Sequence, residues 1–124
     1  MKLIDTILAD APEITAIRRD LHKHPELCFH EERTADVIAK ALTDWGIPIH
    51  RGLGKTGIVG IVKNGTSDRA VGLRADIDAL PMTERNQFPH ASSYLGRMHA
   101  CGHDGHTAML LAAAKHLAKH RNFD

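Results

Sequence analysis

The chain has 124 residues, of which 43% are hydrophobic and 25% are charged. This length and this balance are typical of one compact domain with a hydrophobic core. The 16 Lys and Arg residues nearly equal the 15 Asp and Glu residues, which argues against nucleic acid or an anionic membrane as a partner. Asp5 comes too early for a secretory signal, and no apolar run approaches the roughly 18 residues of a membrane span. Because its two cysteines make no disulfide framework, we expect a cytoplasmic protein.

Two amphipathic helices are predicted near the start of the chain. Apolar residues recur at helical spacing over residues 3–22 and again over residues 31–45. Within the first segment, Pro12 predicts either a kink or a second helix that Asp10 caps. In the second segment, Trp45 is expected to pack in the core, with the charged residues on the solvent face.

Short extended segments follow these helices. Residues 57–62 and 71–75 have the composition of strands, and residues 47–50 form a shorter extended piece. Asn64-Gly65 predicts a tight turn between segments 57–62 and 71–75. Helices, then strands, then a helix predict a layered α/β fold.

The last part of the chain combines a long loop with an apolar helix. Residues 83–101 show no periodic pattern, and loops of this length are usually functional or disordered. Residues 107–120 predict a helix. Its first half, residues 108–114, is almost wholly apolar and is therefore expected to be buried.

A cluster of metal-ligating residue types precedes this last helix. Cys101 and His103 are separated by one glycine, so both side chains can meet one ion, and thiolate and imidazole are good ligands for divalent transition metals. Asp104 and His106 could orient ligands or the substrate, and they fall in the first helical turn, where a carboxylate is favoured. The alternative is a small buried cysteine with surface histidines. The presence of His99 as a third histidine makes that alternative the weaker one.

Two aspartates, Asp76 and Asp78, follow the predicted strand 71–75. Alternate residues of an extended chain point the same way, so both carboxylates could face one cleft and bind a metal or hold a ligating histidine. Aspartates also end strands by forming turns, and spacing alone leaves the two interpretations equally open.

The segment Arg18–Glu26 is basic and ends the first predicted helix. Such an end is usually solvated, because the helix dipole favours cations there, and it predicts no site by itself. Cys28, just after it, is most simply a small buried residue.

Together these segments resemble the amidohydrolase branch of the M20 metallopeptidase family, which includes hippurate hydrolases and N-acyl-L-amino acid amidohydrolases. The resemblance covers nearly the whole chain, and its two long motifs, at residues 73–81 and 98–110, are highly specific. Five stretches match in order: Arg18–Glu26 with Glu31–Ala35, Thr56–Gly60, Leu73–Pro81, Met98–Leu110 and Ala112–Lys115.

The resemblance assigns roles to individual residues. It implies that Cys101 and His103 bind a pair of divalent metal ions, which could be manganese, zinc, nickel or cobalt. It implies that Asp78 stands beside the metals and supports catalysis. Asp76 occupies the place of a histidine ligand of other M20 branches, so its expected role is indirect.

The resemblance also implies a fold and a reaction. The fold would be a layered α/β/α zinc-peptidase-like catalytic domain with a mixed sheet. The reaction would be hydrolysis of the amide bond of N-acyl or N-aroyl amino acids, small molecules such as hippurate, by a metal-activated water. A glutamate would serve as general base, and the metals would stabilise the developing oxyanion.

The chain departs from the family in its extent. In family members, the paired glutamates that include the general base, two further ligand histidines and a dimerisation domain come after the position of Asp124. Residues 1–124 are therefore expected to be the N-terminal portion of an M20 catalytic domain. We expect this portion to be inactive alone and to have an exposed sheet edge. Full-length relatives would be homo-oligomers. The alternatives are a non-catalytic metal-binding remnant that pairs with another chain, and an inert pseudogene product.

Overall fold

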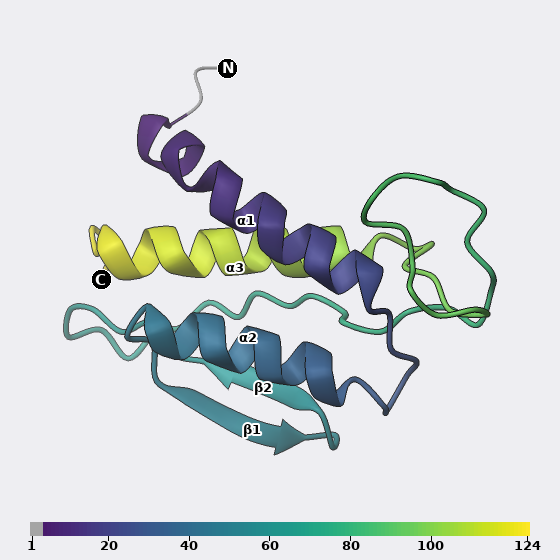
Figure 1. Cartoon of the computed structure of the whole chain (residues 1–124). Helices are drawn as coiled ribbons and strands as arrows, with labels where there is room; N and C mark the ends of the chain where they lie inside the picture. The colour runs from purple at the N-terminus through teal and green to yellow at the C-terminus, as the bar shows by residue number, and fades with distance from the viewer. Residues whose placement is uncertain (1–3) are drawn as a thin grey trace.

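The computed structural model describes residues 4–124, so residue 3, the predicted start of the first helix, lies outside the described residues. The end of α1 and the starts of α2 and α3 lie at the same end of the molecule, beside the irregular segment 83–101 (Figure 1). The elements in chain order are α1 (Asp5–Lys23), α2 (Glu32–Asp44), β1 (Ile49–Leu53), β2 (Gly57–Gly60) and α3 (His103–Lys119).

The first predicted helix forms one element, α1, with Pro12 inside it. Asp10 does not cap a second helix. Its carboxylate instead accepts a hydrogen bond of 2.8 Å from Nζ of Lys115 in α3. The pairing with Lys115 therefore joins α1 to α3, and the helix continues through the proline.

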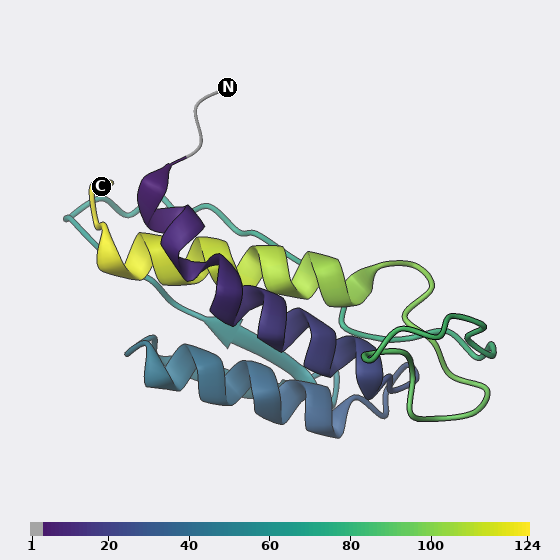
Figure 2. The ribbon, with the colours of Figure 1, turned by 45° about the horizontal axis from the view of Figure 1, so that its top comes forward.

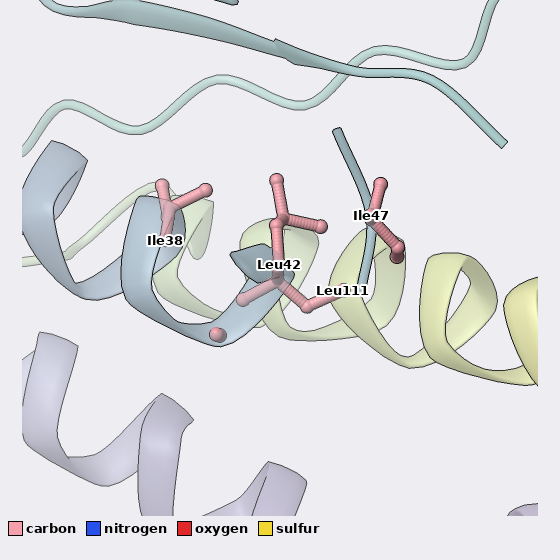
Figure 3. Packing of buried hydrophobic residues seen from close by; sticks show 5 residues of the cluster. Ile38, Leu42, Ile47 and Leu111 are labelled. Carbon is pink, nitrogen blue, oxygen red and sulfur yellow. The ribbon is translucent and has the colours of Figure 1, made fainter. Parts of the chain in front are cut away.

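The hydrophobic core lies between α2 and α3. Ile38 and Leu42, one turn apart on α2, pack with Ile47 and with Leu111 of α3 (Figure 3). Trp45 is half-buried against this cluster, which confirms its predicted place at the core. The spacing of four residues on α2 puts its apolar side chains on one face, and this face holds the helix against α3.

The sheet is smaller than predicted. Within residues 4–124 it consists of β1 and β2, an antiparallel pair in which Ile49 lies opposite Gly60, and α2 lies alongside this hairpin (Figure 1). The expected strand 71–75 and the mixed sheet are not formed, because no neighbouring strand offers residues 71–75 a hydrogen-bonding ladder. These residues remain extended, and Val71 is 89% exposed.

The last helix begins four residues earlier than predicted, at His103. Its buried positions form one stripe rather than the whole first half: Asp104, Thr107, Ala108, Leu111 and Lys115. The predicted burial of residues 108–114 therefore holds for Ala108 and Leu111, whereas Met109 is 64% exposed. A helix that packs on α1 and α2 from one side buries only that side.

Cys28 is exposed, which contradicts its prediction as a buried residue. It lies in the connection between α1 and α2. The Glu26 carboxylate in this connection accepts hydrogen bonds from the amides of Arg33 and Thr34, at 3.1 and 2.7 Å, and so satisfies free N–H groups at the start of α2. None of the helices within residues 4–124 is both long enough and apolar enough to cross a membrane.

We predict that Leu111→Ala destabilises the protein strongly. Leu111 is 3% exposed and leaves a cavity when truncated, so the free energy of unfolding should fall by roughly 2–5 kcal/mol in urea denaturation. Met109→Ala, two residues away on the same helix but 64% exposed, is the control and should change it by less than about 0.5 kcal/mol. Equal losses in the two variants would contradict this description of the core.

Candidate metal site

The candidate site lies where α3 begins, next to the extended segment that ends at Asp78. Gly102 directly precedes α3 and has a φ of +84°, a backbone conformation that residues with side chains rarely adopt. Its carbonyl oxygen accepts hydrogen bonds from the amides of Gly105 and His106, at 2.9 and 3.0 Å. This turn makes His103 the first residue of the helix, at the end that carries free backbone N–H groups.

Asp78 holds the ring of His103. Nδ1 of His103 lies 2.9 Å from Oδ1 of Asp78 and 3.0 Å from the Asp78 carbonyl oxygen. Both oxygens accept, so Nδ1 carries the hydrogen and donates it. In a neutral ring Nε2 then presents a lone pair, which is the arrangement of histidines that bind metals. The chemistry of this pair therefore fits His103 as a metal ligand.

The thiol of Cys101 is exposed and forms no disulfide. This exposure contradicts the alternative in which Cys101 is a small buried residue. His106 is also exposed, and the centroid of its ring lies 5.6 Å from that of His103. Nevertheless, no three His, Cys, Asp or Glu side chains within residues 4–124 are arranged to hold a metal ion. The described residues thus fit part of a donor set, a thiolate and an imidazole, and not a complete one.

Asp76 forms its contacts with Arg74 and Thr107 rather than with Cys101 or His103. Its half-buried carboxylate pairs with Arg74, and its backbone carbonyl accepts a hydrogen bond of 3.2 Å from Oγ1 of Thr107. Of the two carboxylates predicted to face one cleft, only that of Asp78 bonds a residue of the cluster. Asp76 holds the extended segment against α3 through its backbone.

Asp104 is directed into the protein and is only 1% exposed. Its Oδ2 lies 2.8 Å from Nδ1 of His22 and 3.1 Å from Nε of Arg18, both on α1. The basic end of the first helix is therefore not simply solvated, as its composition suggests, because His22 is buried against α3. Any orienting role of Asp104 toward the site acts through the helix that it shares with His103.

The second nitrogen of His22 meets the long irregular segment. Nε2 lies 3.1 Å from Oε1 of Glu84. Glu84 also accepts hydrogen bonds from the Ser92 amide at 2.5 Å and from Nδ2 of Asn86 at 2.9 Å. Burial alone would raise the pKa of Glu84, but these bonds and His22 together lower it below its ordinary value. Glu84 therefore joins α1 to segment 83–101.

His99 lies in the interior rather than on the surface with the thiol. It is 4% exposed, its ring centroid lies 6.3 Å from that of His22, and neither of its nitrogens has a hydrogen-bond partner among the described residues. Burial lowers the pKa of His99, although the nearby charge of Asp104 opposes this shift. The imidazole of His99 is therefore uncharged at neutral pH.

Sequence reasoning missed the contribution of His22 and Glu84. The one local signal is the spacing of four residues between Arg18 and His22, which puts them on one face of α1. The partners of His22 are 82 and 62 positions away in the chain, in Asp104 and Glu84, and nothing in the local pattern points to them.

Comparison with known proteins identifies the family. Residues 72–124 match the sequence profile of Peptidase family M20/M25/M40, and this range contains the predicted site residues from Asp76 to His106. The chain belongs to this family, as its motifs predict, and relatives that are amidohydrolases, described next, indicate the branch.

The relatives share sequence over most of this chain. It is 48% identical to a hippurate hydrolase of Campylobacter jejuni over 100% of its own length and 32% of the relative's. It is 46% identical to an N-acyl-L-amino acid amidohydrolase of Geobacillus stearothermophilus over 92% of its length and 30% of the relative's. The crystal structure of a dinuclear metal-binding M20 peptidase from Bacillus subtilis matches 92% of this chain and 32% of that one, with a TM-score of 0.88 and 41% identity. The chain thus spans about a third of the length of these relatives, and the match confirms the predicted α/β fold class.

The lowered pKa of Glu84 predicts acid sensitivity. A carboxyl whose pKa is lower in the folded than in the unfolded state stabilises the fold above the unfolded value, and this stabilisation is lost as the pH falls through the folded value. Glu84→Gln cannot titrate, so its urea midpoint should fall less steeply than that of the parent between about pH 5 and pH 3. Asp68→Asn, at an exposed loop position, should keep the parent slope. The prediction fails if Glu84→Gln keeps it too.

Proposed function

We propose that this chain is the metal-binding N-terminal portion, residues 1–124, of an amidohydrolase. Its substrates would be N-acyl or N-aroyl amino acids such as hippurate. One observation carries the proposal: Asp78 fixes the ring of His103 through Nδ1, two positions from an exposed thiol, in a chain 48% identical to a hippurate hydrolase. The chain spans about a third of that relative, so hydrolysis of hippurate-like substrates by the whole protein is part of our proposal.

In the proposed site, Cys101 binds as a thiolate and His103 binds through Nε2. Asp78 keeps the hydrogen on Nδ1 and holds the ring in place. Two divalent ions, when bound, would supply a Lewis acid for the amide carbonyl and would lower the pKa of a water molecule. Manganese, zinc, nickel and cobalt all suit a set of thiolate, imidazole and carboxylate, so the donors do not select among them.

The proposed partner, location and oligomeric state come from the sequence alone. The partner is a small-molecule substrate rather than nucleic acid or a membrane, since the charges nearly balance. The cytoplasmic location and the homo-oligomeric state of the whole protein stay predictions. The general base and the remaining donors would come from outside the described residues, because residues 4–124 contain no group of three suitable side chains.

The incomplete donor set within residues 4–124 also suits a second function. The chain would then be a non-catalytic metal-binding remnant, or a part that works only with a partner chain. Sequencing the gene past the codon for Asp124 separates the two functions. An open frame with paired glutamates and later histidines supports the amidohydrolase, and a stop codon supports the remnant.

We predict that the purified chain binds Co²⁺ without hydrolysing hippurate. In isothermal titration calorimetry, Cys101→Ser and His103→Ala should each weaken binding by about 10-fold or more, because each removes one ligand. His116→Ala, a histidine near the other end of α3, should stay within about twofold of the parent. Release of glycine from hippurate by the parent chain, abolished by Cys101→Ala, would refute the predicted inactivity.

A further inference from the structure

We propose that His22 is a positioning residue for the metal site. Held between Glu84 and Asp104, it fixes the first turn of α3 and thereby the placement of His103. This inference deepens the proposed function and rests on it. No feature of the sequence motif around Arg18–Glu26 assigns such a role, and the contacts of the folded chain carry it.

The contacts of His22 are short and lie in the interior. Nδ1 lies 2.8 Å from Oδ2 of Asp104, and Nε2 lies 3.1 Å from Oε1 of Glu84. The side chains of His22, Asp104 and Glu84 are all more than nine-tenths buried. Water therefore competes little for these bonds.

Each ring nitrogen of His22 faces a carboxylate oxygen, Nδ1 that of Asp104 and Nε2 that of Glu84. Two elements of the chain are therefore joined through one buried ring, α3 on one side and segment 83–101 on the other. Arg18, whose side chain is 42% exposed, also pairs with Asp104 from α1.

Contacts from the extended segment and from α1 meet in the first turn of α3. Asp78 bonds the ring of His103 from the extended segment, and His22 bonds the carboxylate of the next residue, Asp104, from α1. Glu84 adds segment 83–101 to the same point, since it also accepts a hydrogen bond from the Ser92 amide. The placement of His103 therefore depends on α1 and on this long loop.

The same helix pair offers a matched control at its other end. Lys115 of α3 is buried and bonds the carboxylates of Asp10 and Glu13 on α1. Figures 1 and 2 show α1 and α3 packed together, and Lys115 lies twelve residues beyond His103, roughly 18 Å along the helix. Lys115→Met therefore removes a comparable buried charge from the α1–α3 interface far from the proposed site.

The test compares His22→Gln with Lys115→Met in the metal-free chain and in Co²⁺ titrations. Hydrogen exchange of the Gly105 and His106 amides, relative to amides 113–117, should speed up about 10-fold or more in His22→Gln and stay at the parent ratio in Lys115→Met. The Co²⁺ affinity should fall about 10-fold in His22→Gln and change less than about twofold in Lys115→Met.

The outcomes separate this inference from the proposed function. Absence of Co²⁺ binding by the parent chain would refute the proposed metal site, and the exchange ratio would still decide the role of His22. An unchanged ratio in His22→Gln, or the same change in both variants, would overturn the positioning role. If His22→Gln loses its helical circular dichroism, Glu84→Gln preserves the shape of the side chain and should shift ratio and affinity in the same direction, by about threefold or more. No shift in that variant would overturn the inference.

Discussion

A carboxylate almost without access to water, that of Asp104, is the constraint on which the arrangement of this domain depends. Burying a charge is costly unless it is paired and hydrogen-bonded. Asp104 is 1% exposed, and its partners, His22 and Arg18, lie on α1. The contact between α1 and α3 is therefore polar as well as apolar, and it supplies the partners that the buried Asp104 carboxylate needs. Because His22 also bonds Glu84, the same charge fixes where segment 83–101 returns to the helices.

This constraint explains how one helical turn faces two environments. Consecutive residues of an α-helix point about 100° apart, so His103 and Asp104 contact different parts of the protein. Asp104 bonds α1, and His103 is left at the edge, where Asp78 reaches its ring from the extended segment. The left-handed conformation of Gly102 starts the helix at this position. The contact of Asp104 with α1 and the contact of Asp78 with His103 thus meet at neighbouring residues of one helical turn.

The sequence predicts features that depend on near neighbours. The apolar spacing in α2 and the two short strands follow from residues a few positions apart, and the structure contains them. Strand 71–75 is not formed because a strand needs a partner, which its own residues do not encode. The burial of His22 escapes the sequence for the same reason, since its partners are 62 and 82 positions away. Composition at a helix end indicates solvation only where no distant carboxylate packs against it.

The contacts that orient the proposed ligand His103 are present in this chain, whereas the set of metal donors is incomplete within the described residues. Asp78 already holds His103, and His22 already holds Asp104, whereas no three donors within the described part of the chain are arranged around one point. A ligand whose tautomer and direction are fixed before the ion arrives loses little freedom on binding. Orientation therefore comes from contacts among α1, α3 and the 76–84 segment, independently of how many donors are present. In the proposed site, Asp78 of this chain fixes the orientation of the His103 imidazole. The remaining metal donors would come from other residues.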